Sequence, residues 1–128
     1  MIIKQLSVFL QNELGRLEEA TKVLSDNSIN ISALSIAETE GYGILRMIVS
    51  DTEKAAAALK ENGFSVKITD VLRVDAPDVP GEVHSIINKL SNAGIDIAYI
   101  YGYSSNGIAP LIIKVSDPEK AEQVIENR

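Results

Sequence analysis

Residues 50–55 read SDTEKA and residues 116–121 read SDPEKA, nearly the same motif at an interval of 66 residues. With this offset, residues 6–62 align with residues 72–128 without a gap and share 15 identities over 57 positions. Composition alone would give roughly 3 or 4 identities. The chain of 128 residues is therefore a tandem duplication, and each half helps to interpret the other.

Each half begins with a strand and a helix. The first strands are predicted at residues 5–10 (QLSVFL) and 71–76 (VLRVDA), where apolar and polar residues alternate at least in the second copy. A loop with a glycine follows, and apolar residues then recur at helical spacing from Leu17 to Leu24 and from Val83 to Leu90. Next come strands at 29–37 and 95–103, hairpin turns at 40–41 and 106–107, and strands at 44–49 and 111–115.

The repeated motif predicts the start of a second helix in each half. A serine at the N-cap and a glutamate three residues later form a capping box, here Ser50 with Glu53 and Ser116 with Glu119. Residues 63–69 (GFSVKIT) then supply a fourth strand, so the order is β-α-β-β-α-β. We predict an α+β protein of two ferredoxin-like units, residues 1–69 and 70–128, each an antiparallel sheet with its helices on one face. The second unit lacks a final strand, which is either missing from this sequence or replaced.

Charge and composition exclude several classes of function. The net charge of -6 and pI near 4.7, with scattered Lys and Arg, argue against a nucleic-acid partner. The absence of cysteine excludes thiol nucleophiles and thiolate metal sites, and a single histidine leaves no catalytic or metal cluster. We therefore expect no enzyme activity, no metal and no cofactor. Apolar runs are too short for a membrane helix and no signal peptide is evident, so the expected location is the cytoplasm.

The loops carry a resemblance to a known family. Residues 11–17 (QNELGRL), with Asn30 between Ile29 and Ile31, resemble the ACT domain family of small amino-acid-binding regulatory modules. The second half is similar to the family more literally, in residues 78–83 (DVPGEV) and 94–97 (GIDI). The resemblance covers essentially the whole chain as two ACT units.

The resemblance implies a ligand site at the loops after the first strands and at an interface between ACT units. Asn12 and Asn30 match positions that contact ligand in amino-acid-binding members, and the paired carboxylates Asp78 and Asp96 favour the first unit as the amino-acid site. Asn12 and Asp78 could instead cap their helices; ligand contact is favoured for Asn12 and capping for Asp78. The full set of candidate ligand-binding residues is Gln11, Asn12, Glu13, Leu14, Gly15, Asn30, Ile31, Asp78, Val79, Pro80, Gly81, Asp96 and Ile97.

These features together predict a non-catalytic regulatory protein. It would bind a free amino acid or a similar small ligand, form a homodimer, and act allosterically through its association state or on a regulated enzyme. The alternative is a ligand-free interaction module that assembles oligomers or serves as a regulatory subunit of an enzyme of amino-acid metabolism.

Overall fold

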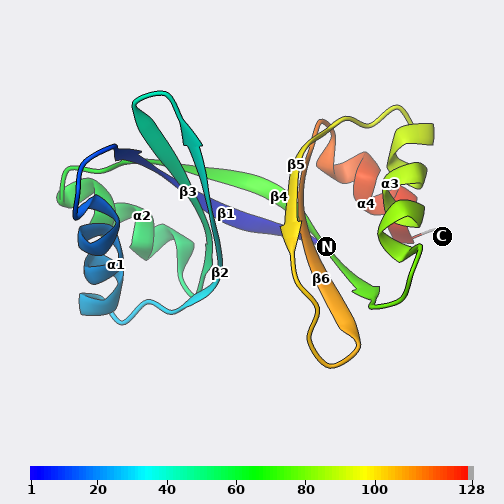
Figure 1. Cartoon of the computed structure of the whole chain (residues 1–128), viewed down its shortest axis with the longest axis horizontal. Coiled ribbons are helices and arrows are strands. Elements are labelled where there is room, and N and C mark those ends of the chain that lie inside the picture. The colour runs from blue at the N-terminus through cyan, green and yellow to red at the C-terminus, as the bar shows by residue number, and fades with distance from the viewer. Residues whose placement is uncertain (127–128) are drawn as a thin grey trace. The chain divides into compact units, whose positions relative to one another are not determined.

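The structure is a computed structural model that describes residues 1–126 (Figure 1). Its elements follow in the order β1 (Ile2–Gln11), α1 (Arg16–Asp26), β2 (Ile31–Thr39), β3 (Tyr42–Val49), α2 (Thr52–Glu61), β4 (Ser65–Pro77), α3 (Glu82–Asn92), β5 (Ile97–Gly102), β6 (Ile108–Val115) and α4 (Pro118–Glu126). The chain forms two compact units. One is Lys4–Thr69, and the other joins Met1–Ile3 to the chain from Asp70 onward.

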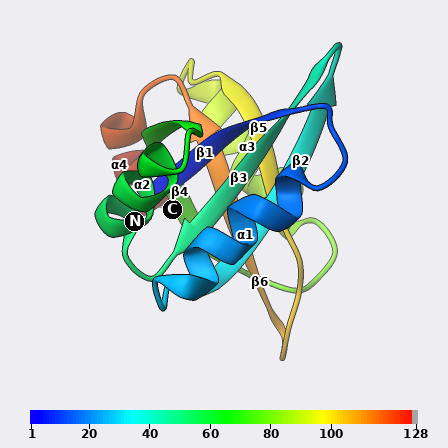
Figure 2. The same cartoon turned by 90° about the vertical axis from the view of Figure 1, so that its left-hand side faces the viewer.

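The unit Lys4–Thr69 is an antiparallel sheet covered on one face by two helices. Its strands lie in the order β2-β3-β1-β4, with β3 between β1 and β2. Helices α1 and α2 lie side by side on this sheet (Figures 1 and 2). The core forms where the apolar stripes of the helices meet the strands, and its buried members include Leu6, Val8, Leu24, Leu45, Met47 and Leu59.

The second unit repeats this arrangement with the strand order β1-β4-β6-β5. Helices α3 and α4 pack on its sheet and enclose a separate core that includes Leu72, Ile86, Leu90, Ile113 and Ala121. The predicted α+β fold of two ferredoxin-like units is confirmed. Within residues 1–126, no helix is long and apolar enough to cross a membrane.

Strand β4 is longer than either strand predicted in this region. Residues 63–69 and 71–76 were expected to be separate strands, but Ser65–Pro77 is a single strand of 13 residues. Asp70 interrupts the apolar pattern without breaking the backbone pairing, because a solvent-exposed polar residue fits an extended strand. The division between the two compact units falls within this strand, between Thr69 and Asp70.

The start of β1 takes the place of the strand that the second half lacks. Met1 and Arg73 exchange two backbone hydrogen bonds, of 3.0 and 2.8 Å, as facing residues of antiparallel strands do. The Ile2 side chain packs against the second core, and the Ile2 amide donates a 2.9 Å hydrogen bond to a carboxylate oxygen of Glu122 in α4. Met1–Ile3 therefore group with the second unit, not with the 1–69 unit expected from the repeat.

The predicted capping boxes are wrong in both halves. Helix α2 begins at Thr52 and its N-cap is Asp51, whose carboxylate accepts a 3.1 Å hydrogen bond from the Lys54 amide. Asp117 makes the same 3.1 Å bond with Lys120 at the start of α4. Each aspartate directly precedes its helix, so its carboxylate reaches a free amide of the first turn, and the preceding serine is left to bond elsewhere.

Candidate functional site

The loop between β1 and α1 lines a pocket of about 240 Å³ in the first unit. Gly15 at the N-cap of α1 has φ 91° and ψ -6°, a left-handed conformation that favours glycine, and this turn directs the chain from the strand into the helix. The end of β2 closes the opposite side. The lining residues are Leu10, Gln11, Asn12, Glu13, Arg16, Leu17, Ile36, Glu38 and Gly43.

Arg16 is the cation of this pocket. Its guanidinium carbon lies 4.2 Å from the centroid of the Phe64 ring, and one terminal nitrogen donates a 2.7 Å hydrogen bond to Glu19. The Nε atom is buried and has no hydrogen-bond partner among the described residues. An unsatisfied buried donor costs about 1–3 kcal/mol, so an acceptor that reached this group would stabilise the site.

The other polar groups of the pocket complement Arg16. Glu13 and Glu38 supply carboxylates, and Gln11 and Asn12 supply amide groups that can donate or accept. The Asn12 side chain makes no hydrogen bond within residues 1–126, so it does not cap α1. The lining of the pocket therefore includes groups of both charges.

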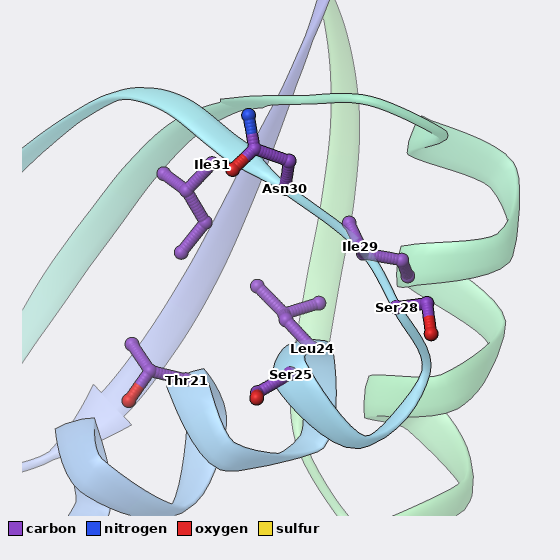
Figure 3. A pocket seen from close by; sticks show the side chains of 7 residues that line it. All are labelled: Thr21, Leu24, Ser25, Ser28, Ile29, Asn30 and Ile31. Carbon is purple, nitrogen blue, oxygen red and sulfur yellow. The ribbon is translucent and has the colours of Figure 1, made fainter.

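Asn30 and Ile31 line a different pocket, at the other end of α1 (Figure 3). Its volume is about 460 Å³ and its wall is completed by Thr21, Leu24, Ser25, Ser28 and Ile29. The eleven residues of α1 span roughly 16 Å, so one copy of this unit does not bring Asn12 and Asn30 into one pocket.

Ser50 holds Asn30 in place. The Asn30 amide donates to the Ser50 hydroxyl at 3.0 Å, and the Ser50 amide donates to the Asn30 carbonyl at 2.9 Å. Asp96 and Ser116 form the same pair in the second unit, at 3.0 Å for both bonds. The serine of the repeated motif thus fixes the entry to the second strand of each unit, next to Ile31 or Ile97.

The loop of the second unit differs in chemistry. Asp78, Val79 and Pro80 are exposed before Gly81, which repeats the left-handed turn with φ 91°. The Asp78 carboxylate makes no hydrogen bond within residues 1–126, so the expectation that it caps α3 is wrong. Glu82 occupies the position that Arg16 has in the first unit, so this loop carries two carboxylates and no guanidinium.

Sequence reasoning missed several residues of the first pocket. Leu14 is fully exposed and Gly15 shapes the turn, but neither lines the pocket, whereas Arg16, Glu38 and Ile36 do. Arg16 and Glu82 hold equivalent positions of the repeat with opposite charge, and this contrast was a signal that could have identified Arg16. No comparable signal existed for Glu38. It lies more than twenty residues from the β1–α1 loop in sequence, and it reaches the pocket only through the β2 hairpin. Among residues 1–126, no three metal-binding side chains gather into a cluster.

Comparisons with known proteins agree with this architecture. The profile of one protein family, described as ACT domain pair, matches residues 1–128. The crystal structure of protein BT0572 from Bacteroides thetaiotaomicron is similar with 46% identity and a TM-score of 0.95, over 99% of this chain and 88% of that chain. No curated protein matches the chain.

Two more distant structures share the fold alone. The ligand-free regulatory subunit of aspartate kinase from Thermus thermophilus is 14% identical, with a TM-score of 0.73 over 99% of this chain and 96% of that chain. E. coli aspartokinase III, in complex with lysine and aspartate, is 17% identical with a TM-score of 0.59. That match covers 98% of this chain and 31% of the enzyme.

Proposed function

Because the chain belongs to the ACT domain family, as a pair of these regulatory modules, we propose that it binds a free α-amino acid and performs no catalysis of its own. The ligand occupies the pocket between the β1–α1 loop and the end of β2 in the first unit. The observation that carries the proposal is that Arg16, whose buried Nε has no hydrogen-bond partner among the described residues, lines this pocket together with carboxylate and amide side chains.

The charges of the pocket suit a zwitterion. The Arg16 guanidinium and the free amides at the start of α1 attract a carboxylate, since a helix N-terminus carries a partial positive charge. Glu13, Glu38 and the side-chain oxygen of Asn12 accept hydrogen bonds from an ammonium group. Leu10, Leu17 and Ile36 provide apolar surface for a side chain.

The loop of the second unit is a poorer match for the same ligand. Glu82 replaces Arg16, and Asp78 replaces Asn12. Two carboxylates favour the ammonium group of an amino acid but repel its carboxylate. We therefore assign the amino-acid site to the first unit.

Binding is converted into a signal by population shift. A ligand changes an equilibrium between two arrangements only by as much as its affinity differs between them. The relevant arrangements are association states, of this protein with itself or with a regulated enzyme. The ligand-bound aspartokinase III from E. coli, which shares the fold, supports a role of this kind in amino-acid metabolism.

The proposal is tested by a thermal-shift screen of the twenty amino acids, followed by calorimetric titration of each hit. A ligand at 100 times its dissociation constant adds roughly 2.7 kcal/mol to stability and raises the melting temperature clearly. Arg16→Gln should weaken binding by about tenfold to 100-fold, because a charge-assisted hydrogen bond contributes about 1.5–3 kcal/mol. Asn12→Ala should abolish the response while the fold persists.

Lys22→Gln is the matched control, since it removes the same charge from the same helix at a site outside this pocket. Binding in Lys22→Gln should equal that of the unchanged protein. The proposal is wrong if no amino acid stabilises the protein at millimolar concentration, or if Arg16→Gln and Lys22→Gln bind a hit equally well.

A ligand-free assembly module is the second candidate. The apolar and exposed edge of β2 favours it, because such an edge invites pairing with another strand. Self-association without binding of any amino acid would support this candidate over the first.

A further inference from the structure

The charges in the lining of the Arg16 pocket do not balance. As described for residues 1–126, the lining has two carboxylates, of Glu13 and Glu38, and one guanidinium, of Arg16. Arg16 is already engaged in a 2.7 Å ion pair with Glu19. The carboxylates of Glu13 and Glu38 make no ion pair or hydrogen bond with another described residue. The pocket therefore has a surplus of negative charge that a neutral zwitterion would leave uncompensated.

The second unit does not repeat these two carboxylates. By the repeat, Val79 corresponds to Glu13 and Ser104 corresponds to Glu38. Both counterparts are uncharged, yet the second unit forms the same strands and helices around them. The fold therefore does not require a carboxylate at either position. This contrast separates Glu13 and Glu38 from the residues that build the unit.

The places of these groups along the chain indicate how they would divide an amino acid among them. The carboxylate and the ammonium group of an α-amino acid are attached to the same carbon, so the residues that bind them must lie close together. Asn12, Glu13 and Arg16 lie within five residues of one loop. Glu38 comes from a different element, near the end of β2. It is therefore the group available for a charge farther along the side chain of the ligand.

The apolar part of the lining suits a long aliphatic stem. Leu17 is 39% exposed and Ile36 is 47% exposed, and both line the pocket. Long cationic side chains lay their methylene groups along such surface and keep the charged end near polar groups. The volume of about 240 Å³ is smaller than the roughly 300 Å³ of the smallest pockets for drug-sized ligands, so it suits a single amino acid.

We propose that the ligand of this pocket is an α-amino acid whose side chain carries a second positive charge, and that Glu38 selects for that charge. A diamine without a carboxylate would offer no acceptor to Arg16, whose Nε has no partner among the described residues. An acidic amino acid would bring a further carboxylate to a pocket that already has Glu13 and Glu38. The pocket thus discriminates against both.

Calorimetric titration with matched ligands tests this class. Lysine, ornithine and arginine are compared with norleucine, which has the carbon chain of lysine without its terminal ammonium group, and with cadaverine, which is lysine without its carboxylate. The tightest of the cationic amino acids should bind at least about tenfold more tightly than norleucine or cadaverine. This is the lower end for a charge-assisted hydrogen bond, because Glu38 is exposed. Norleucine, cadaverine or glutamate binding as tightly as every cationic amino acid would overturn the proposal.

Glu38→Gln tests the selecting residue. The variant should lower the affinity for lysine to about that for norleucine and leave the affinity for norleucine unchanged. Glu40→Gln is the matched control, because Glu40 is exposed in the turn that follows β2 and does not line the pocket. It should keep the preference for lysine. The role of Glu38 is wrong if Glu38→Gln keeps this preference, or if it weakens lysine and norleucine equally.

This inference rests on the proposed function, and the two fail in different ways. If no amino acid binds, both are wrong. If a neutral or acidic amino acid binds most tightly and Arg16→Gln weakens it, the amino-acid site stands and the preference for a cationic side chain is wrong.

Discussion

Ser50 and Asp51 are adjacent, yet their side chains bond to different parts of the first unit. The Ser50 hydroxyl accepts from the Asn30 amide, whereas the Asp51 carboxylate accepts from the Lys54 amide and caps α2. The repeated motif therefore joins the start of one helix to the entry of a strand twenty residues earlier. A capping box at the motif would have satisfied helix amides alone.

Removal of the cap should be measurable at the residue scale. Asp51→Ala should lower the free energy of unfolding by about 1 kcal/mol, because an amide of the first turn of α2 loses its partner. Glu53→Ala should change it by less than about 0.5 kcal/mol, as expected for an exposed residue without such a role. Urea unfolding midpoints compare the two variants. An equal loss of unfolding free energy in both variants would contradict this assignment and support the capping box.

At the scale of elements, β2 and β5 come from equivalent positions of the repeat but have different surroundings. A side chain at Gly102, the end of β5, would fall against the carbonyl oxygen of Pro110 and lie 3.1 Å from the Leu111 side chain. Such close approach of β6 leaves no room for the aliphatic residue that β2 carries at Ile36. Duplication has thus produced one strand with a crowded end and one with an apolar exposed edge.

Gly102→Ala tests this crowding. It should destabilise the protein by about 1–3 kcal/mol, because backbone atoms of β6 must move to admit the methyl group. Gly43→Ala is the control in the first unit, since its added methyl would meet the nearest atom, in Ile36, at an ordinary 3.7 Å. We expect the stability of Gly43→Ala to change by less than about 0.5 kcal/mol. Melting temperatures of the two variants measure the difference, and equal values would contradict the crowded geometry.

At the scale of the whole molecule, the first residues of the chain complete the unit formed by the last. Met1 pairs with Arg73, and Ile2 reaches both the second core and Glu122 of α4. Strands β1 and β4 each contribute residues to both compact units. The second unit therefore includes a segment that lies about seventy residues away in sequence.

Deletion of Met1–Ile3 should loosen the second unit selectively. The Arg73 amide, which donates to the Met1 carbonyl at 2.8 Å, should exchange its hydrogen about fivefold faster, because one hydrogen bond contributes about 1 kcal/mol. The Phe64 amide, bonded to Leu59 in the first unit, is the control and should keep its rate. Hydrogen exchange followed by NMR measures both amides. An unchanged Arg73 rate would show that these residues do not support the second sheet.

The sequence by itself determined the duplication, the order of elements, the hairpins and the family, because these follow from local periodicity, turn chemistry and loop motifs. The positions of both loop glycines and of the amphipathic helices were predictable for the same reason. Tertiary structure alone decided that Met1–Ile3 join the second unit and that β4 is continuous, since an apolar strand pattern does not specify which sheet it enters.

The same limit applies to the candidate site. Arg16, Glu38 and Ile36 meet only because the β2 hairpin folds back over the start of α1, and Asn12 and Asn30 separate because α1 lies between them. Local sequence determines which residue types a loop offers. Contacts between segments distant in the chain determine which of them share a pocket, because those contacts depend on the packing of the whole unit.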